Sequence, residues 1–376
     1  MNAKYVLVKS YYGLGGDLCV LVGAMRFAKQ TGREMVVDWN GGLYGRTPSG
    51  NLINEYFESP HYLTPSVLKD QSLNVFPPHW KPYLDAPPLT YAKDLDLTVS
   101  RPEEVPPDCH ADCVVITRDS RRMTRCPEDF AATAQSLRPV ERIRARVEAM
   151  MARMGRSRPS IGIHFRHGNG ERKVIPPDPR WFRNRINARL RSLGLEPNQV
   201  SLLVATDCQG VLEYFARHYP NTFATEKIYR SNGSGAMHVG RTDLNDEQKL
   251  GLADEALVDM YALADCSYFV GSKGFFSLFV KLVRGKRHTL LYEGERLFNQ
   301  YEFTDQFHPA VRDPLLGAAL KRARQPLDGL FVRIEADRRN LYYYHDIVFS
   351  TSINTVQISA DELRTMTRAI IDRRTY

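Results

Sequence analysis

A short segment near the middle of the chain concentrates charged and flexible residues directly after an apolar run. It reads Ile161-Gly-Ile-His164-Phe-Arg166-His167-Gly-Asn-Gly-Glu171. An arginine in this place can hold two phosphate oxygens with its planar guanidinium, and it keeps its charge when buried. A nearby carboxylate such as that of Glu171 can accept a hydroxyl proton. The pattern predicts a phosphate clamp at Arg166, against the simpler alternatives of a surface ion pair there and a core histidine at His164.

Two later apolar runs also end in polar groups. Asp207 follows the first of them, and the second leads into a polar turn with Ser272, Phe275 and Ser277 that opens a helix. The start of a helix favours anions, because its backbone N–H groups are free and its dipole is positive there. Asp259 lies in a helical stretch between the two runs. Its carboxylate could accept two N–H groups of a guanine ring, while a solvated surface charge is the simpler alternative.

A glycine-rich turn, Gly13-Leu-Gly15-Gly16, follows the first apolar run of the chain. A strand at 5–8, a helix at 17–31 and a strand at 35–38 surround it and predict a βαβ unit. Gly13 and Gly15 would let the backbone approach a phosphate. A tight turn without a ligand explains these glycines equally well.

The elements that would position these residues alternate between short apolar strands and amphipathic helices. Further strands are predicted at 161–165, 201–206, 268–271 and 289–292, and further helices at 179–193, 209–219, 254–265 and 275–284. This alternation predicts an α/β fold with parallel, doubly wound sheets, whose ligands bind at the carboxyl ends of the strands. A chain of 376 residues exceeds the usual size of a single core. We expect a Rossmann-like domain over 1–157, a second Rossmann-like, nucleotide-binding domain over 158–350 and a helical segment over 351–376.

The stretch from 41 to 107 is rich in proline, glycine and aromatic residues and shows no regular period. We expect loops there that shape an acceptor site, with Trp39 and Trp80 offering flat faces to sugar rings. Burial in the core is the stronger alternative for both side chains.

The composition is that of a water-soluble globular protein, and the first ten residues lack the order of a signal peptide. We therefore expect a cytoplasmic protein without a transmembrane segment. The net charge is +8, but many arginines lie between 138 and 158, where Val140, Ile143, Val147, Met151 and Met154 form one apolar stripe. This pattern predicts a helix with a solvated basic face and argues against nucleic-acid binding. Cys109, His110 and Cys113 lack the spacing of a zinc site, and no metal is predicted.

Several of these segments resemble the fucosyltransferase family that includes the rhizobial nodulation α-1,6-fucosyltransferase and the eukaryotic core α-1,6-fucosyltransferase, with the bacterial branch closer. The resemblance rests on the segment from His164 to Glu171, on Val-Ala-Thr-Asp207, on Asp259 ahead of Phe-Val-Gly-Ser272, and on Gly13 to Gly16 with Thr-Gly-Arg33. It reaches from the first strand to about residue 285. It implies a GT-B architecture, in which two Rossmann-like domains face a cleft and the second holds most of a GDP-sugar.

The resemblance also implies roles for single residues. Arg166 corresponds to the ligand of the donor diphosphate, His164 and Asp259 lie near guanine, Asp207 lies in the donor pocket and Glu171 takes the place of the base. The implied donor site further includes Gly13, Gly15, His167, Ser272, Phe275 and Ser277. Two departures exist, because the eukaryotic branch has a second arginine where this chain has His167, and a longer loop to the base.

The implied reaction is inverting transfer of L-fucose from GDP-β-L-fucose to a hydroxyl of an oligosaccharide, in α-1,6 linkage and without a divalent metal. The Asp94-Leu-Asp96 pattern is expected to be surface. A transferase for another GDP-sugar and a non-catalytic nucleotide or carbohydrate binder remain alternatives. A nicotinamide oxidoreductase is a weaker one, because Asp38 follows the second strand but the glycine turn lacks GxGxxG.

Overall fold

The computed structural model describes residues 3–9, 12–47, 51–59, 62–69, 72–86, 100–125, 128–155, 157–167, 179–227, 244–272, 274–285, 287 and 289–292, with the backbone of three strands after residue 330. Packing divides the chain into two compact units. Unit 1 contains residues 1–162, 238–269 and 274–289, and unit 2 contains residues 163–237, 270–273 and 290–376. Both units are therefore discontinuous in sequence. The linear division into 1–157, 158–350 and 351–376 stays a prediction.

Unit 1 is built on a four-stranded sheet with the order β2-β1-β5-β4. The strands are β1 (Tyr5–Lys9), β2 (Glu34–Asp38), β4 (Val75–Phe76) and β5 (Cys113–Ile116), and all three pairings are parallel. β1 lies inside the sheet, and Val6, Leu7 and Val8 are all buried. Such a continuous apolar run is typical of a parallel strand that is covered on both faces.

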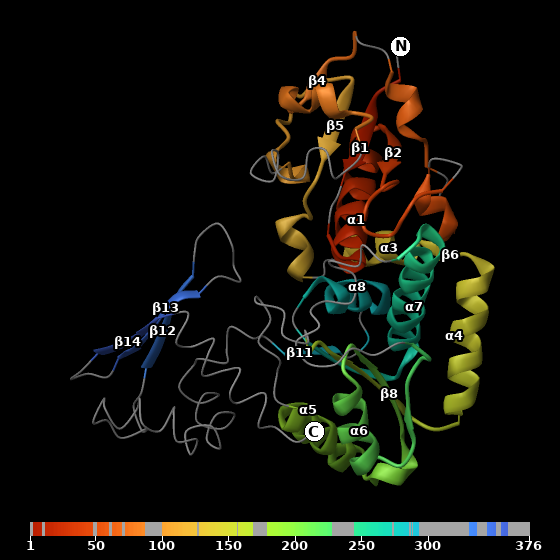
Figure 1. The fold of residues 1–376 in the computed structure, drawn as a ribbon, viewed down its shortest axis with the longest axis vertical. Helices are drawn as coiled ribbons and strands as arrows, with labels where there is room; N and C mark the ends of the chain where they lie inside the picture. The colour runs from red at the N-terminus through yellow and green to blue at the C-terminus, as the bar shows by residue number, and fades with distance from the viewer. Residues whose placement is uncertain are drawn as a thin grey trace. The chain divides into compact units, whose positions relative to one another are not determined.

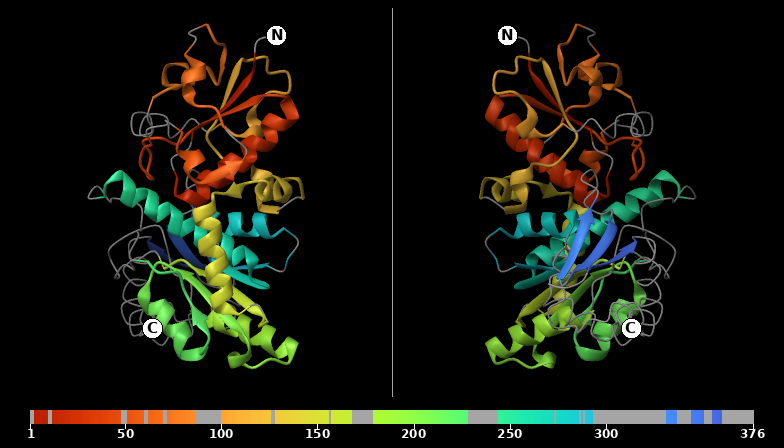
Figure 2. Two further views of the ribbon diagram at one scale, coloured as in Figure 1. Left: turned by 90° about the vertical axis from the view of Figure 1, so that its right-hand side faces the viewer. Right: turned by 90° about the vertical axis from the view of Figure 1, so that its left-hand side faces the viewer.

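Five α-helices belong to the described part of unit 1: α1 (Leu14–Thr31), α3 (Glu128–Gln135), α4 (Glu141–Met154), α7 (Asp246–Asp265) and α8 (Phe275–Arg284). α8 packs against α1, α3 and α7, and α7 packs against α4 (Figure 1; Figure 2). Helices from the second half of the chain therefore cover elements from the first half. The Arg284 side chain of α8 strengthens this packing by donating to three carbonyls at the end of α7, those of Leu263, Ala264 and the C-cap residue Cys266.

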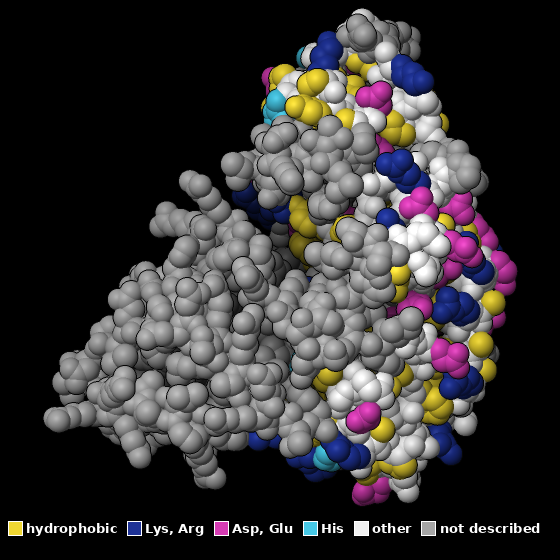
Figure 3. Space-filling model, in the orientation of Figure 1, with side chains coloured by type: hydrophobic (Ala, Val, Ile, Leu, Met, Phe, Trp, Pro, Cys, Tyr) yellow, Lys and Arg dark blue, Asp and Glu magenta, His cyan; other side chains and the backbone are white. Residues whose placement is uncertain are grey.

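The basic face of α4 is balanced by acidic neighbours. Arg142 forms a two-pronged ion pair with Asp254 of α7, at 2.8 and 2.9 Å, and Arg144 pairs with Glu58 at 2.8 Å. Figure 3 shows basic and acidic side chains interspersed over the edge of the molecule that carries α4 and α7. The predicted helix with a solvated face is confirmed, although its stripe includes Met150 in place of Met151.

Unit 2 is built on a five-stranded sheet with the order β11-β10-β7-β8-β9. The strands are β7 (Ser160–Phe165), β8 (Ser201–Thr206), β9 (Thr222–Phe223), β10 (Tyr268–Ser272) and β11 (Thr289–Tyr292), of which β7, β10 and β11 begin in unit 1. Helices α5 (Pro179–Leu193) and α6 (Gln209–His218) follow β7 and β8. Phe165 of β7 contacts Phe182 of α5 and Phe215 of α6, with ring centroids 5.1 and 6.4 Å apart. These aromatic contacts fix both helices on one face of β7.

Most predicted elements are confirmed, four of them with unchanged bounds: 179–193, 201–206, 275–284 and 289–292. α7 begins earlier than predicted, at Asp246, because Asn245 and Gln248 form a capping box. α1 also begins earlier, at Leu14, so that the glycine-rich turn forms its first turn.

Shorter elements complete the described chain. They are strands β3 (Phe57–Ser59) and β6 (Arg138–Pro139), and 3-10 helices at Leu52–Glu55, Pro65–Leu68, Pro78–Tyr83, Pro102–Glu104, Arg121–Arg125 and Pro197–Gln199. Near the C-terminus, β12 (Phe331–Ala336), β13 (Tyr344–Ser350) and β14 (Thr355–Ser359) form an antiparallel sheet. β14 lies in the segment over 351–376, for which a helix was expected.

Gly15 permits the close approach of the first turns of α1 and α8. A Cβ atom at this position would lie 2.6 Å from the Phe276 nitrogen and 2.7 Å from its Cα. Backbone atoms cannot move aside as a flexible side chain does. The Gly15→Ala substitution should therefore lower the free energy of unfolding by about 1–3 kcal/mol.

Urea unfolding of the two alanine variants measures this effect. Gly251→Ala is the matched control, because it also lies in a helix but its Cβ would meet nothing within 4 Å. It should stabilise the protein by about 0.5–1 kcal/mol. Equal stability of Gly15→Ala and wild type would contradict the close packing of α1 and α8.

Candidate active site

The candidate site lies where the strand order of unit 2 reverses. From β7 the chain proceeds outward to β8 and β9, and then returns to the other side of β7 as β10. In open α/β sheets, ligands bind at the carboxyl ends of the strands beside such a reversal. Those ends are the segments at His164–His167 and at Ser272.

The Ser272 hydroxyl joins these two strand ends. Its Oγ donates to the His164 carbonyl oxygen at 3.1 Å and accepts from the Arg166 backbone N–H, also at 3.1 Å. Ser272 is buried, so this pair of bonds is shielded from water. The backbone that carries Arg166 is thereby fixed at the edge of the sheet, while its side chain is only half-buried.

The next strand holds the other side of the same segment. The Asp207 carboxylate, just past β8, accepts from the His167 backbone N–H at 2.8 Å. His167 is buried and Asp207 is half-buried. Thus Ser272 and Asp207, from the strands on either side of β7, together hold two successive N–H groups, those of Arg166 and His167.

His164 is the last polar residue of β7 and has a side chain that is only 8% exposed. Burial, and then repulsion by the Arg166 and Lys227 cations, lowers the pKa of His164 to about 3. The imidazole is therefore neutral at physiological pH and presents one donor and one acceptor nitrogen. A neutral ring of this kind can bind a heterocyclic base or a sugar hydroxyl.

The start of α8, another predicted anion site, belongs to unit 1. Gly274 precedes this helix with φ 147° and ψ 169°, a conformation that residues with a side chain rarely adopt. Phe275 is half-buried and its ring lies 6.2 Å from that of Tyr12, whereas Ser277 is completely buried. Of the polar turn, Lys273 lies outside the described residues.

Asp259 lies within α7, also in unit 1, and only 3% of it is exposed. The alternative of a solvated surface charge is therefore wrong for this residue. A carboxylate that is buried in this way has a structural or binding role.

The glycine-rich turn offers fewer N–H groups to an anion than its sequence suggests. The Leu14 N–H donates to the Tyr44 hydroxyl, and the Gly16 and Asp17 N–H groups donate to the Gly13 carbonyl oxygen at 2.7 and 3.2 Å. Asp17 also places a buried carboxylate in the first turn of α1. The structure thus explains Gly15 by helix packing.

Two aromatic residues expected at an acceptor site are buried instead. Trp39 is 4% exposed and Trp80 is 2% exposed. Trp80 packs in a core cluster with Leu7, Val36 and Val115. Neither ring offers an open face, so the alternative of core packing fits both. The candidate base Glu171 lies outside the described residues.

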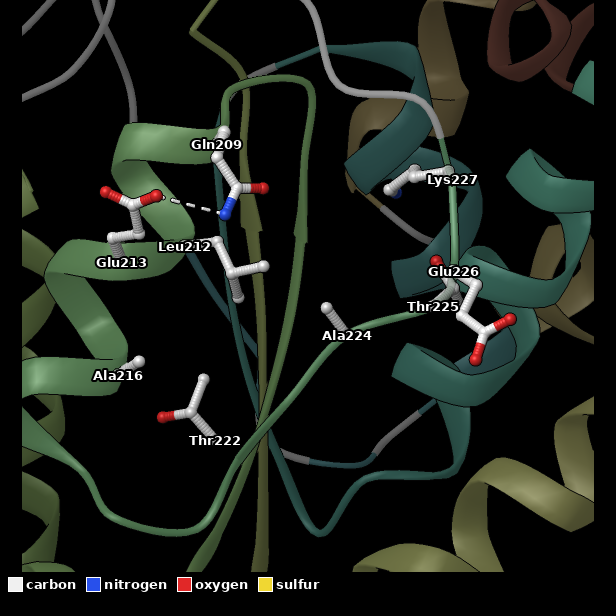
Figure 4. Close-up of a pocket in the computed structure, with 9 residues that line it drawn as sticks. All are labelled: Gln209, Leu212, Glu213, Ala216, Thr222, Ala224, Thr225, Glu226 and Lys227. Atoms are coloured by element: carbon white, nitrogen blue, oxygen red, sulfur yellow. Dashed lines mark hydrogen bonds between the residues drawn. The ribbon is translucent and has the colours of Figure 1, made fainter.

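Sequence reasoning missed a pocket beside β9, with a volume of about 630 Å³. Its walls are the first turns of α6 and the segment from Thr222 to Lys227 (Figure 4). The signal in the sequence was weak, because β9 has only two residues and no apolar run marks it. Its carboxyl end nevertheless lies on the same edge of the sheet as Arg166 and Asp207.

Comparison with known proteins decides the family. The sequence model of the Nodulation protein Z (NodZ) family matches residues 2–286. Nodulation protein Z of Bradyrhizobium diazoefficiens is 30% identical over 290 residues, which cover 70% of this chain and 74% of the relative. The protein of the same name from Sinorhizobium fredii is 29% identical over 288 residues, which cover 71% and 86% of the two chains. This chain belongs to the Nodulation protein Z family.

Solved structures agree with this assignment at the level of the fold. The crystal structure of fucosyltransferase NodZ from Bradyrhizobium is 22% identical with a TM-score of 0.55, and the match covers 78% of this chain and 97% of that one. A crystal of NodZ α-1,6-fucosyltransferase soaked with GDP-fucose gives 22% identity and a TM-score of 0.54, over 75% and 93% of the chains. The predicted membership of this fucosyltransferase family and the predicted GT-B-type α/β fold are confirmed. Strands β12 to β14 lie beyond the residues that the family shares.

The described part of this NodZ-family chain contains neither a cluster of metal ligands nor a membrane-spanning helix. No group of three or more His, Cys, Asp or Glu side chains there could hold a metal ion, and Asp94 and Asp96 lie outside it. None of the described helices combines the length and the apolar character that a membrane crossing requires. Asp38, the carboxylate considered for a nicotinamide cofactor, is buried in an ion pair with Lys9.

The neutral state of His164 predicts a pH dependence of stability. Below pH 6.5 the unfolded chain binds a proton at this histidine, and the folded chain does so only near pH 3. The neutral His164 therefore stabilises the folded protein above pH 6.5, and this stabilisation is lost as the pH falls. Between pH 7 and pH 5 the free energy of unfolding should decrease by about 2 kcal/mol for this reason.

The measurement is urea unfolding of wild type and of His164→Gln, which cannot titrate, at both pH values. From pH 7 to pH 5, the free energy of unfolding should fall by about 2 kcal/mol more in the wild-type protein than in the variant. An equal loss in both proteins would show that the folded protein binds this proton above pH 5.

Proposed function

We propose that this chain transfers L-fucose from GDP-β-L-fucose to a hydroxyl group of an oligosaccharide, in α-1,6 linkage and with inversion at the anomeric carbon. Membership of the Nodulation protein Z family supports the fucosyl donor, since crystals of NodZ α-1,6-fucosyltransferase have been soaked with GDP-fucose and grown with GDP. The observation that carries the proposal is the fixed position of Arg166, whose backbone is held by Ser272 at the reversal of the strand order.

In the proposed reaction, the oxygen of the acceptor hydroxyl attacks the anomeric carbon while the bond from that carbon to the β-phosphate oxygen breaks. The acceptor proton passes to a base, for which Glu171 is the candidate. Negative charge grows on the departing GDP, and a guanidinium held in place stabilises it without moving during the reaction. Arg166 is the residue that we assign to this task.

The other donor contacts follow from the chemistry of each side chain. His164, as a neutral ring, binds the guanine base, and the buried carboxylate of Asp259 accepts the two N–H groups of its Watson–Crick edge. Asp207 orients the segment that carries Arg166 and His167. We assign the first turn of α8, with Ser272 before it and Phe275 and Ser277 within it, to the phosphate or fucose group, and we propose that no divalent metal takes part.

The test is an assay of GDP release with GDP-fucose, GDP-mannose and UDP-glucose over an array of oligosaccharide acceptors. Release that requires GDP-fucose and an acceptor is the expected result. Release with GDP-mannose in place of GDP-fucose would favour a transferase for another GDP-sugar. Tight binding of GDP-fucose without release over any acceptor would favour a non-catalytic binding protein.

Replacing Arg166 by lysine tests the phosphate clamp. A lysine keeps the charge but cannot form two parallel bonds to the diphosphate. We expect Arg166→Lys to lower kcat/KM by more than tenfold, or about 1.4 kcal/mol. Arg217→Lys, an exposed position on α6, is the control and should keep full activity. A fully active Arg166→Lys variant would contradict the proposal that Arg166 binds the diphosphate through two parallel bonds.

Chelation tests the absence of a metal. If Arg166 and the dipole of a helix start neutralise the leaving group, then fucosyl transfer should proceed at the same rate with and without EDTA. The rate is measured by GDP release. A loss of activity in EDTA that manganese or magnesium restores would contradict this part of the proposal.

A further inference from the structure

Lys227 stands at the carboxyl edge of the same sheet as Arg166. β9 ends at Phe223, and the chain continues through Ala224, Thr225 and Glu226 to Lys227. β9 is the second strand from β7, on the far side of β8. The four-carbon stem of a lysine lets its ammonium group reach beyond the backbone that carries it. Lys227 is therefore placed to share a ligand with Arg166.

Lys227 lines the pocket beside β9. Its side chain is half-buried, and Thr225 on the same segment is buried. The opposite wall is the start of α6, where Gln209 donates to Glu213 at 3.1 Å (Figure 4). This wall begins two residues after Asp207, which holds the backbone beside Arg166. The pocket and the strand-end site are thus parts of one edge of the sheet.

The His164 ring is influenced by both cations. Repulsion by Arg166 and by Lys227 contributes, after burial, to the low pKa of His164. Positive charges from β7 and from the segment after β9 therefore both act on the histidine at the end of β7.

The charge of the ligand requires more than one cation. The diphosphate of a nucleotide sugar carries about two negative charges, and its terminal phosphate gains up to one more when the sugar leaves. One arginine balances only part of this charge. A second cation that acts across the sheet edge would stabilise both the bound donor and the departing diphosphate.

We propose that Lys227 is a second cationic ligand of the nucleotide diphosphate and acts together with Arg166. This inference rests on the proposed function. It assigns to Lys227 the phosphate groups, and not the base or the ribose. Removal of the lysine charge should therefore weaken binding of GDP much more than binding of guanosine.

The experiment measures the affinity of GDP, GMP and guanosine by calorimetry for wild type, Lys227→Met, Lys227→Arg and Arg217→Met. We expect Lys227→Met to weaken GDP binding by about tenfold, to weaken GMP less and to leave guanosine unchanged. Lys227→Arg should retain most of the affinity for GDP. Arg217→Met removes one exposed positive charge from α6 of the same unit, and it should bind all three ligands as wild type does.

Each other outcome has a definite meaning. If Lys227→Met binds GDP with the affinity of wild type, the proposed role of Lys227 is overturned. It is also overturned if the variant loses as much affinity for guanosine as for GDP. A similar loss in Arg217→Met shows a general effect of net charge and also overturns it. Wild-type protein that binds no GDP contradicts the proposed function itself, which is a separate result.

Discussion

A serine hydroxyl, that of Ser272, joins the ends of two strands on which the candidate site depends. It accepts from the Arg166 N–H and donates to the His164 carbonyl. A hydrogen bond between buried partners contributes about 1 kcal/mol, and leaving such groups unsatisfied costs more. The neighbouring strand adds the bond from His167 to Asp207. The backbone around Arg166 is thus fixed from both sides, and a clamp on a diphosphate requires a fixed backbone.

Burial gives the two parallel sheets different uses. At the carboxyl edge of the first sheet, Lys9 of β1 pairs with Asp38 of β2 and also donates to the Ala86 carbonyl at 2.8 Å. Both side chains are almost completely buried, so this edge is closed by its own ion pair. At the edge of the second sheet, Arg166 and Asp207 are half-buried and His164 is neutral. The second edge is therefore the one whose charged groups are less completely buried.

Most strands and helices between residues 160 and 292 could be predicted from sequence, because apolar runs and glycines mark their ends directly. The bonds of Ser272 to the backbone of His164 and Arg166 agree with the expectation that parallel strands bring their carboxyl ends together. The packing of α7 and α8 against elements of the first half could not be predicted, because periodicity gives the apolar face of a helix but not its partner. The same limit applies to Trp80, because an aromatic ring is typical of a core and also occurs in sugar sites, and the sequence does not show whether it is buried.

Two further features depend on contacts that sequence patterns do not record. The glycines at the start of α1 suggest a phosphate loop, yet Gly15 faces the backbone of Phe276 and the N–H groups of Leu14 and Gly16 have partners inside the protein. Lys227 follows a strand of two residues, which is too short to be found by a hydrophobic pattern. Its place on the sheet edge became visible only through the strand order.

The central claim is that the nucleotide binds at the reversal of the strand order in unit 2. Hydrogen exchange measured by mass spectrometry, with and without saturating GDP, tests it most directly. The account predicts slower exchange at the carboxyl ends of β7, β8 and β10, with the N–H groups of Arg166, His167 and Ser272 among those protected. Protection confined to the carboxyl ends of β1 and β2, with the end of β7 unchanged, would place the nucleotide on the other sheet and contradict the account.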